Sequence, residues 1–388
     1  MTTPATPPSS PKPRASPGFI AVRVLFAGVA ALALWNTLRQ AELGRAAALA
    51  AAVGAPIALA LLPYVAIIGC HAEAYRRVLG VLGHRVSFPR IYSVVLSTEA
   101  VLMSFPAGIA VSDSLNPYLL RRRCDIPIPD GLAGIAAKKS LIVLSNALYI
   151  VIALAFGFSG LRLASERLLG FRGLEWIVAG SAVALFVMFF AMTKALVSGS
   201  LAARSHGLLA RIPSARLRSF LAEKKSGFLA TDRHFAVLFR ERRSSLAAST
   251  VVFLGMWLLE SVETLVILRL LHVSLGFSSV LSLEVVVVML RSLAFVVPGA
   301  LGVLDAGYVA FLGAFGVPDA PTVGVAFMLI KRAKELLWIG VGFLIFLVMK
   351  DAPPRAAAAA ADPLLAGGLA PSPRSSAHGD DAGPRNIG

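Results

Sequence analysis

The sequence has little cysteine and lacks the common catalytic motifs. It contains only two cysteines, Cys70 and Cys124, so neither a disulfide framework nor a CxxC metal site is available. Its six histidines are scattered, without HExxH or any other paired ligand spacing. GxSxG, Walker A and GxGxxG motifs are also missing. We therefore expect no enzyme, no cofactor and no metal site.

Charged residues are also scarce. They make up 15% of the 388 residues, while 57% are hydrophobic; a soluble domain carries about 25% charged residues. The mean hydropathy is +0.77. Most apolar residues fall in runs of about 18 or more, long enough to cross about 30 Å of hydrocarbon as helices. Because helices satisfy their own backbone hydrogen bonds, we expect an all-α polytopic membrane protein.

The formal net charge of +16 does not indicate a nucleic-acid-binding protein. The basic residues flank apolar spans and have few aromatic residues among them, which is better explained by attraction to anionic lipid. Residues 1–18 and 351–388 are rich in Pro, Ala, Ser and Gly, and we expect both tails to be disordered and cytoplasmic. The membrane domain is then residues 19–350, with a basic cytoplasmic loop at 199–244.

Eight hydrophobic segments are found between the tails. Six have the length and composition of complete spans: Phe19–Leu38, Ala46–Cys70, Gly131–Gly157, Leu174–Val197, Leu246–Leu271 and Thr322–Met349. The other two, Ile91–Leu120 and Val280–Phe315, are each broken near the middle by proline and glycine, at residues 105–108 and 298–302.

The positive-inside rule decides whether the broken segments are kinked spans or re-entrant hairpins. If Ile91–Leu120 were one kinked span, the basic triplet Arg121–Arg123 would lie outside. If both segments are hairpins, the triplet and the 199–244 loop lie in the cytoplasm, while the sparsely charged loops His272–Ser279 and Gly316–Pro321 lie outside. We therefore predict six spans plus two re-entrant hairpins, with both termini cytoplasmic.

The two hairpins are predicted to enter from opposite faces, which is the geometry of an inverted repeat. Sliding the sequence by 192 residues without a gap aligns rare residue types within apolar helices. The aligned pairs are Pro106 with Pro298, Asp113 with Asp305, Pro129 with Pro321, and Lys139 with Lys331. The alternative is a coincidence between two proline-broken helices.

Charged residues inside the predicted spans need partners or a wet cavity, because each costs roughly 2.5–3.5 kcal/mol at the bilayer centre. Lys331 and Glu335 are four residues apart and could neutralise each other within one helix. Glu99 and Arg291 could pair across the repeat axis, and Glu284 could be solvated near an interface.

A half-helix that begins at membrane depth exposes unsatisfied N–H groups and the positive end of its dipole, which can bind an anion. We expect the half-helices after the two breaks, with Lys139 and Lys331, to hold a phosphate or carboxylate in one midplane cavity. The predicted substrate-binding residues are Pro106, Gly108, Asp113, Lys139, Glu260, Arg291, Pro298, Gly299, Gly302, Asp305, Lys331, Arg332 and Glu335.

Three stretches resemble a known family: residues 256–260 (MWLLE), 291–303 (RSLAFVVPGALGV) and 331–335 (KRAKE). They are similar to the flippase-like transmembrane domain of lysylphosphatidylglycerol synthases, in particular its hopanoid-associated HpnL subgroup. The likeness covers roughly residues 20–350 and is specific mainly in the last hundred. The subgroup usually has glutamate after the Pro-Gly turn, where this chain has Asp305.

The resemblance implies a bacterial inner-membrane protein that moves a polar-headed or anionic lipid between leaflets, or carries it, in a context linked to hopanoids. Only 38 mostly low-complexity residues follow Lys350, so we expect no aminoacyl transfer. The alternatives are a scaffold for a lipid-synthesis complex and a small-solute or ion carrier. Membrane lipids are the expected partners, and a second copy of the chain or a lipid-biosynthesis enzyme is left open.

Overall fold

The computed structural model describes residues 28, 32, 35–105, 108–197, 243–293 and 302–349. Both tails, most of the first predicted span, most of the 199–244 loop and the central residues of both breaks lie outside this part. The described residues form helices and no strand. The elements are α2 (Leu43–Ala52), η1 (Ala55–Ala60), α3 (Leu61–Val81), α4 (Phe88–Ser104), α5 (Gly108–Cys124), α6 (Ile128–Leu169), α7 (Leu174–Val197), α10 (Arg243–Leu270), α11 (Phe277–Leu293), α12 (Val303–Ala314) and α13 (Ala320–Val348).

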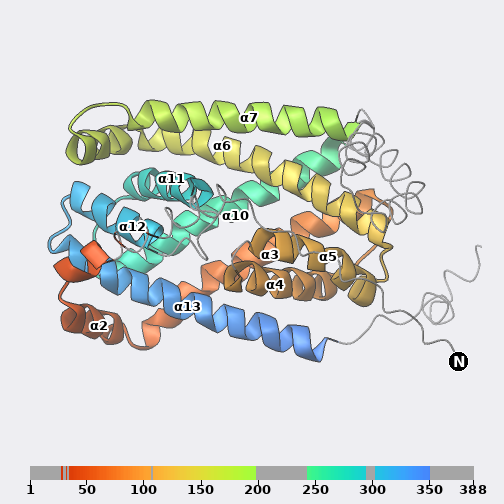
Figure 1. Ribbon diagram of the computed structural model, residues 1–388, viewed down its shortest axis with the longest axis horizontal. Helices are drawn as coiled ribbons and strands as arrows, with labels where there is room; N and C mark the ends of the chain where they lie inside the picture. The colour runs from red at the N-terminus through yellow and green to blue at the C-terminus, as the bar shows by residue number, and fades with distance from the viewer. Residues whose placement is uncertain are drawn as a thin grey trace, which may run out of the picture.

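The helices form an elongated bundle (Figure 1). α6 and α7 lie side by side along one edge, and α13 runs along the opposite edge against α4. α10 crosses the interior and packs mainly on α3 and α6. Gly342 allows the close approach of α13 to α4, because a Cβ there would lie 2.7 Å from the carbonyl oxygen of Leu96. Small residues serve the same purpose in other membrane bundles.

Four helical segments are long and apolar enough to cross a membrane: Ala55–Val81, Ile128–Leu169, Leu174–Ala195 and Ser244–Leu270. This confirms a polytopic all-helical protein, and α7 has the bounds predicted from the sequence. α13 is 29 residues long but carries four charged residues in its middle, at positions 331, 332, 334 and 335. It is therefore not one of the four, although the sequence predicts Thr322–Met349 as a complete span.

The predicted span Ala46–Cys70 is wrong in its bounds. Helix α2 ends at Ala52, because Gly54 has a left-handed φ of 56° and Pro56 begins the next helical segment. The membrane-length segment instead continues to Val81. Glu73 makes this possible, since it pairs with Arg76 at 2.7 Å and Arg77 at 2.8 Å on the helix surface.

Helix α6 is also longer than the predicted Gly131–Gly157. It has 42 residues, about 63 Å at 1.5 Å per residue, so it exceeds a bilayer of about 40–45 Å including headgroups. Glu166 pairs with Arg162 and Arg172 near its end, and Gly170 terminates it with a φ of 74°. The predicted loop after the third span is therefore largely helical.

Both broken segments fold back on themselves, as predicted. The hydroxyl of Ser112 in α5 donates to the carbonyl oxygen of Thr98 in α4 at 2.9 Å. A continuous helix would separate these residues by about 21 Å. In the second segment, the Tyr308 hydroxyl of α12 donates to Glu284 of α11 at 2.9 Å. Both segments are helical hairpins, and the kinked-span alternative is excluded.

The hairpin α4–α5 lies in one half of the long axis and α11–α12 in the other (Figure 1). Arg45 contacts Asp319 at 3.0 Å at one end of the bundle. Arg122 donates to the carbonyl oxygen of Met349 at 3.5 Å at the other end. Arg45 and Asp319, both predicted to lie outside, are thus together. Which end faces the cytoplasm, the number of spans and the inverted repeat remain predictions.

Cysteine labelling of intact cells tests the orientation. In a background with Cys70 and Cys124 replaced by serine, Arg122→Cys should react with an impermeant maleimide only after the cells are opened. Ser274→Cys, at an exposed position in the α10–α11 loop, should react in intact cells. The opposite pattern would contradict a cytoplasmic Arg122. Labelling of both cysteines from outside would contradict the three crossings, α6, α7 and α10, that separate the two positions.

Candidate functional site

Charged side chains from four helices meet where the second hairpin packs on α10 and α13. We call this group the charged cluster: Glu260 of α10, Glu284 and Arg291 of α11, Asp305 of α12, and Lys331, Arg332 and Glu335 of α13. It contains four carboxylates and three cations, so its formal net charge is −1. Six of its seven members were predicted as site residues, and Glu284 was not.

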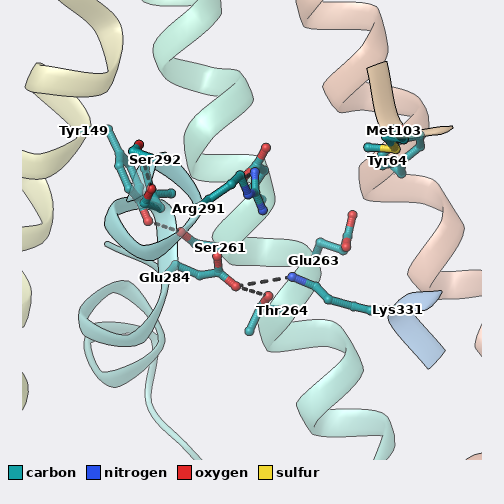
Figure 2. Close-up of polar contacts among 12 residues, drawn as sticks. Tyr64, Met103, Tyr149, Ser261, Glu263, Thr264, Glu284, Arg291, Ser292 and Lys331 are labelled. Carbon is teal, nitrogen blue, oxygen red and sulfur yellow. Dashed lines mark hydrogen bonds and ion pairs between the residues drawn. The ribbon is translucent and has the colours of Figure 1, made fainter. Parts of the chain in front are cut away.

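Glu284 is the most deeply buried member, with 1% of its side chain exposed. Its Oε1 accepts hydrogen bonds from Thr264 of α10, from the Tyr308 hydroxyl at 2.9 Å and from Lys331 Nζ at 3.4 Å. Lys331 also donates to Tyr308 at 2.7 Å. Figure 2 shows the carboxylate of Glu284 between Thr264 and Lys331. Glu284 therefore connects α10, α12 and α13, and the prediction that it is solvated is wrong.

Arg332 joins the second hairpin to α13. It donates to Asp305 at 3.0 Å and to Glu335, one turn along its own helix, at 2.6 Å. Asp305 also accepts the backbone N–H of Gly302 at 2.9 Å, where Gly302 has a φ of 82°. Gly302 precedes α12, so this contact is the backbone half of a capping box with Asp305 in the first turn. A carboxylate of the chain itself therefore lies at the helix end that was predicted to bind an anion.

Two of the predicted ion pairs differ in the structure. Lys331 does not pair with Glu335, because Glu335 contacts Arg332 and Lys331 contacts Glu284. Arg291 pairs with Glu260 at 3.3 Å. Glu99 is close enough to Arg291, Glu260 and Lys138 to interact electrostatically, but its described contacts include no hydrogen bond to Arg291. Lys331 thus has its partner on another helix, whereas Glu335 has a partner, Arg332, on its own helix.

The charged cluster lines a small pocket. Arg291, Asp305, Lys331, Arg332 and Glu335 face it, together with Leu304, Tyr308, Phe327 and Met328. Its free volume is about 20 Å³, which is room for about one water molecule. The pocket brings together five of the predicted site residues. Of the remainder, Pro106, Pro298 and Gly299 lie outside the described residues.

The first hairpin holds its own ion pair. Lys139 of α6 contacts Asp113 of α5, and both side chains are about one-third exposed. Gly108 begins α5 so close to α4 that a Cβ would lie 2.0 Å from the Leu102 carbonyl oxygen. Neither Asp113 nor Lys139 lines the pocket of the charged cluster. The predicted single cavity shared by Asp113, Lys139, Asp305 and Lys331 is therefore not seen; the two hairpins carry separate pairs.

Several buried polar residues in and beside the cluster were not among the predicted site residues. Lys334 of α13 pairs with Glu263 of α10, both being almost fully buried, and its ammonium lies 4.5 Å from the centre of the Tyr64 ring. Lys138 lies at the same distance from the Tyr75 ring. Glu263 follows Glu260 by three residues, and Tyr308 follows Asp305 by three. This spacing is the signal that could have found them.

The buried pair Lys334–Glu263 should behave as a structural unit. Lys334→Met or Glu263→Leu alone leaves an uncompensated buried charge, which costs about 3–5 kcal/mol. The double variant, Lys334→Met with Glu263→Leu, should recover most of that loss. Thermal unfolding of the purified variants in detergent tests this, and additive losses in the double variant would contradict the pairing.

These features can be compared with known proteins. A family model described as the lysylphosphatidylglycerol synthase TM region matches residues 18–342. No curated protein is similar enough to the chain to count as a match. The family match confirms the resemblance, while the hopanoid-associated subgroup stays a prediction. The chain belongs to the family of the lysylphosphatidylglycerol synthase TM region, a membrane domain associated with lipid-related functions.

Proposed function

We propose that this protein moves a polar-headed lipid between the leaflets of the bacterial inner membrane, with the headgroup passing through the charged cluster. The observation that carries the proposal is the position of Arg332 and Glu335 at the edge of the pocket. About a quarter of each side chain is exposed. Their neighbours on α13 at helical spacing, Leu329 and Leu336, are 42% and 69% exposed.

Exposed leucines on a membrane helix face the acyl chains. Leu329 precedes Arg332 by three residues and Leu336 follows it by four, so all three lie on one face of α13. The charged pocket therefore adjoins a surface that an acyl chain can contact. A carrier for a small solute would need an aqueous entrance at the bundle end instead. The neighbouring apolar surface favours a lipid substrate.

The cations of the cluster provide contacts for a phosphate or carboxylate. Arg332 offers a planar fork that can hold two oxygens, whereas Lys331 offers a point charge deeper in the pocket. Since the pocket holds about one water, a headgroup must first displace side chains. The Arg332–Glu335 pair, which is more exposed than the Lys331–Glu284 pair, would open first. Asp113 of α5 and Lys139 of α6 would receive the headgroup in the other half of the bundle.

The alternatives explain less of the structure. A scaffold needs no ion pairs in its interior, and each buried charge costs free energy in the membrane. For a metal-ion carrier, the described residues show no group of three or more His, Cys, Asp or Glu that could hold a metal ion. The cytoplasmic location of both termini, a hopanoid context and partnership with lipid-synthesis enzymes or a second copy belong to this proposal as well.

Substitution of the cations tests the function. Lys331→Ala and Arg332→Ala should each slow the movement of a headgroup-labelled lipid in proteoliposomes at least tenfold, about 1.4 kcal/mol, because each removes a headgroup contact. Lys331→Arg should retain part of the activity, since the charge is kept. Arg77→Ala is the matched control: it removes an exposed cation on α3 that pairs with Glu73.

Lipid movement should be measured at equal protein content per vesicle. If Lys331→Ala and Arg332→Ala move the lipid at the wild-type rate, both residues have only a structural role. That result would contradict passage of the headgroup through the cluster. Equal slowing by Arg77→Ala would show a general effect of lost positive charge.

A further inference from the structure

We propose that Glu284 is a proton-binding site, and that a proton enters the charged cluster together with the anionic group of the lipid. The inference rests on the proposed function and deepens it, because it identifies the ion that accompanies the lipid. It is carried by the burial of Glu284, by its unused oxygen and by the charge balance of the cluster.

The two oxygens of Glu284 have different surroundings. Oε1 accepts from Thr264, Tyr308 and Lys331. Oε2 is buried and has no hydrogen-bond partner among the described residues. A buried carboxylate oxygen without a donor is costly, and protonation removes that cost because the group becomes neutral. Glu263, the other deeply buried carboxylate nearby, has no unpartnered buried oxygen in the same part of the chain.

The charge balance requires a proton when an anion binds. The cluster already has four carboxylates and three cations, so an added phosphate would bring its formal net charge to −2. Lys331 is the only cation in contact with Glu284 among the described residues. If the headgroup takes Lys331, Glu284 loses its counter-charge while staying buried. Proton uptake then restores the net charge to −1.

The other described groups around Glu284 do not supply the positive charge that it loses with Lys331. Those close enough to act on it are Tyr149 of α6, Glu260 of α10, Arg291 of α11, Tyr308 of α12 and Lys331 of α13. Arg291 is engaged by Glu260 at 3.3 Å. The Tyr149 hydroxyl is engaged by Ser261 at 2.9 Å, as Figure 2 shows. The carboxylate of Glu260 and the two phenols carry no positive charge that could stabilise ionised Glu284.

The same surroundings favour a proton over a metal cation. Thr264 and Tyr308 direct their hydroxyl protons at Glu284, so a metal ion bound to the carboxylate would have to displace these donors. The ammonium of Lys331 lies 3.4 Å from Oε1 and would repel a cation. A proton needs only one free oxygen, and Oε2 provides it.

The coupled step balances in charge and atoms. The lipid anion forms an ion pair with the Lys331 ammonium, and the Lys331–Glu284 pair breaks. Oε2 of Glu284 then takes one proton from a hydronium ion of the aqueous phase, which becomes water, and the group becomes a carboxylic acid. On release of the lipid, the proton leaves Oε2 and the pair with Lys331 forms again. Lipid and proton therefore move through the cluster together, and a pH gradient can drive the lipid.

The pH dependence of binding tests the proposal. The probe is a short-chain phosphatidylglycerol, added to the full-length protein in detergent between pH 6 and pH 9 or so. Uptake of one proton on binding predicts that the Kd rises by up to about tenfold for each pH unit of increase. Glu284→Gln should bind with a Kd that does not change with pH. Glu263→Gln, the matched control, should keep the wild-type slope.

The outcomes separate the two proposals. Failure of the wild type to bind phosphatidylglycerol would overturn the proposed function. Binding with a flat pH profile in the wild type, or with the wild-type slope in Glu284→Gln, would overturn the proton site alone. If Glu284→Gln does not fold, infrared difference spectra of the wild type, recorded with and without lipid, test the proton site instead. A new carboxylic-acid C=O band on lipid addition supports the site, and its absence contradicts it.

Discussion

A charged side chain within a bilayer must be paired, because hydrocarbon offers neither water nor counter-ions. In this protein the pairs join different helices and thereby determine how the second half packs. Glu284 ties α11 to α10, α12 and α13, and Arg332 ties α13 to α12. Removing one partner from a buried pair of this kind strongly destabilises the fold. The same groups, however, are also the charged ligands that the pocket offers to a lipid headgroup.

The charged residues thus hold the helices together and also offer contacts to a headgroup. These two roles explain why their side chains differ in exposure. Lys334 and Glu263 are almost fully buried and behind the pocket, where they support the fold. Lys331 is 13% exposed, and Arg332 and Glu335 are about twice as exposed. A headgroup that arrives from the side of α13 meets Arg332 and Glu335 first and Glu284 last. Exchange of ion-pair partners, rather than creation of new charges, would then carry the headgroup inward.

Much of the fold follows from local sequence chemistry. Proline and glycine break both split segments where the hairpins turn, and the apolar run of α7 gives its bounds directly. Local chemistry also explains the errors. Gly54 and Pro56 end a helix inside an apolar run, whereas Glu73 neutralises Arg76 and Arg77 and extends a helix through a polar stretch. Averaged hydrophobicity detects neither effect.

The partners within the site could not be predicted in the same way. Helical spacing shows which residues share a face, so it suggests Lys331 with Glu335. It does not show which side chain a neighbouring helix presents, and Glu284 of α11 reaches Lys331 only through the hairpin fold. The matching positions in the two halves likewise predicted one cavity shared by Asp113, Lys139, Asp305 and Lys331. In the structure, Asp113 of α5 pairs with Lys139 of α6.

The central claim is that a lipid headgroup enters the charged cluster from the side of α13. Photo-crosslinking with a lipid that carries a photoreactive group in its headgroup measures this most directly. After illumination in native membranes and peptide mapping, the account predicts adducts in α12 and α13 around Asp305 and Met328, two residues that line the pocket. Adducts confined to the outer apolar surface, such as the exposed Phe190 of α7, would contradict it.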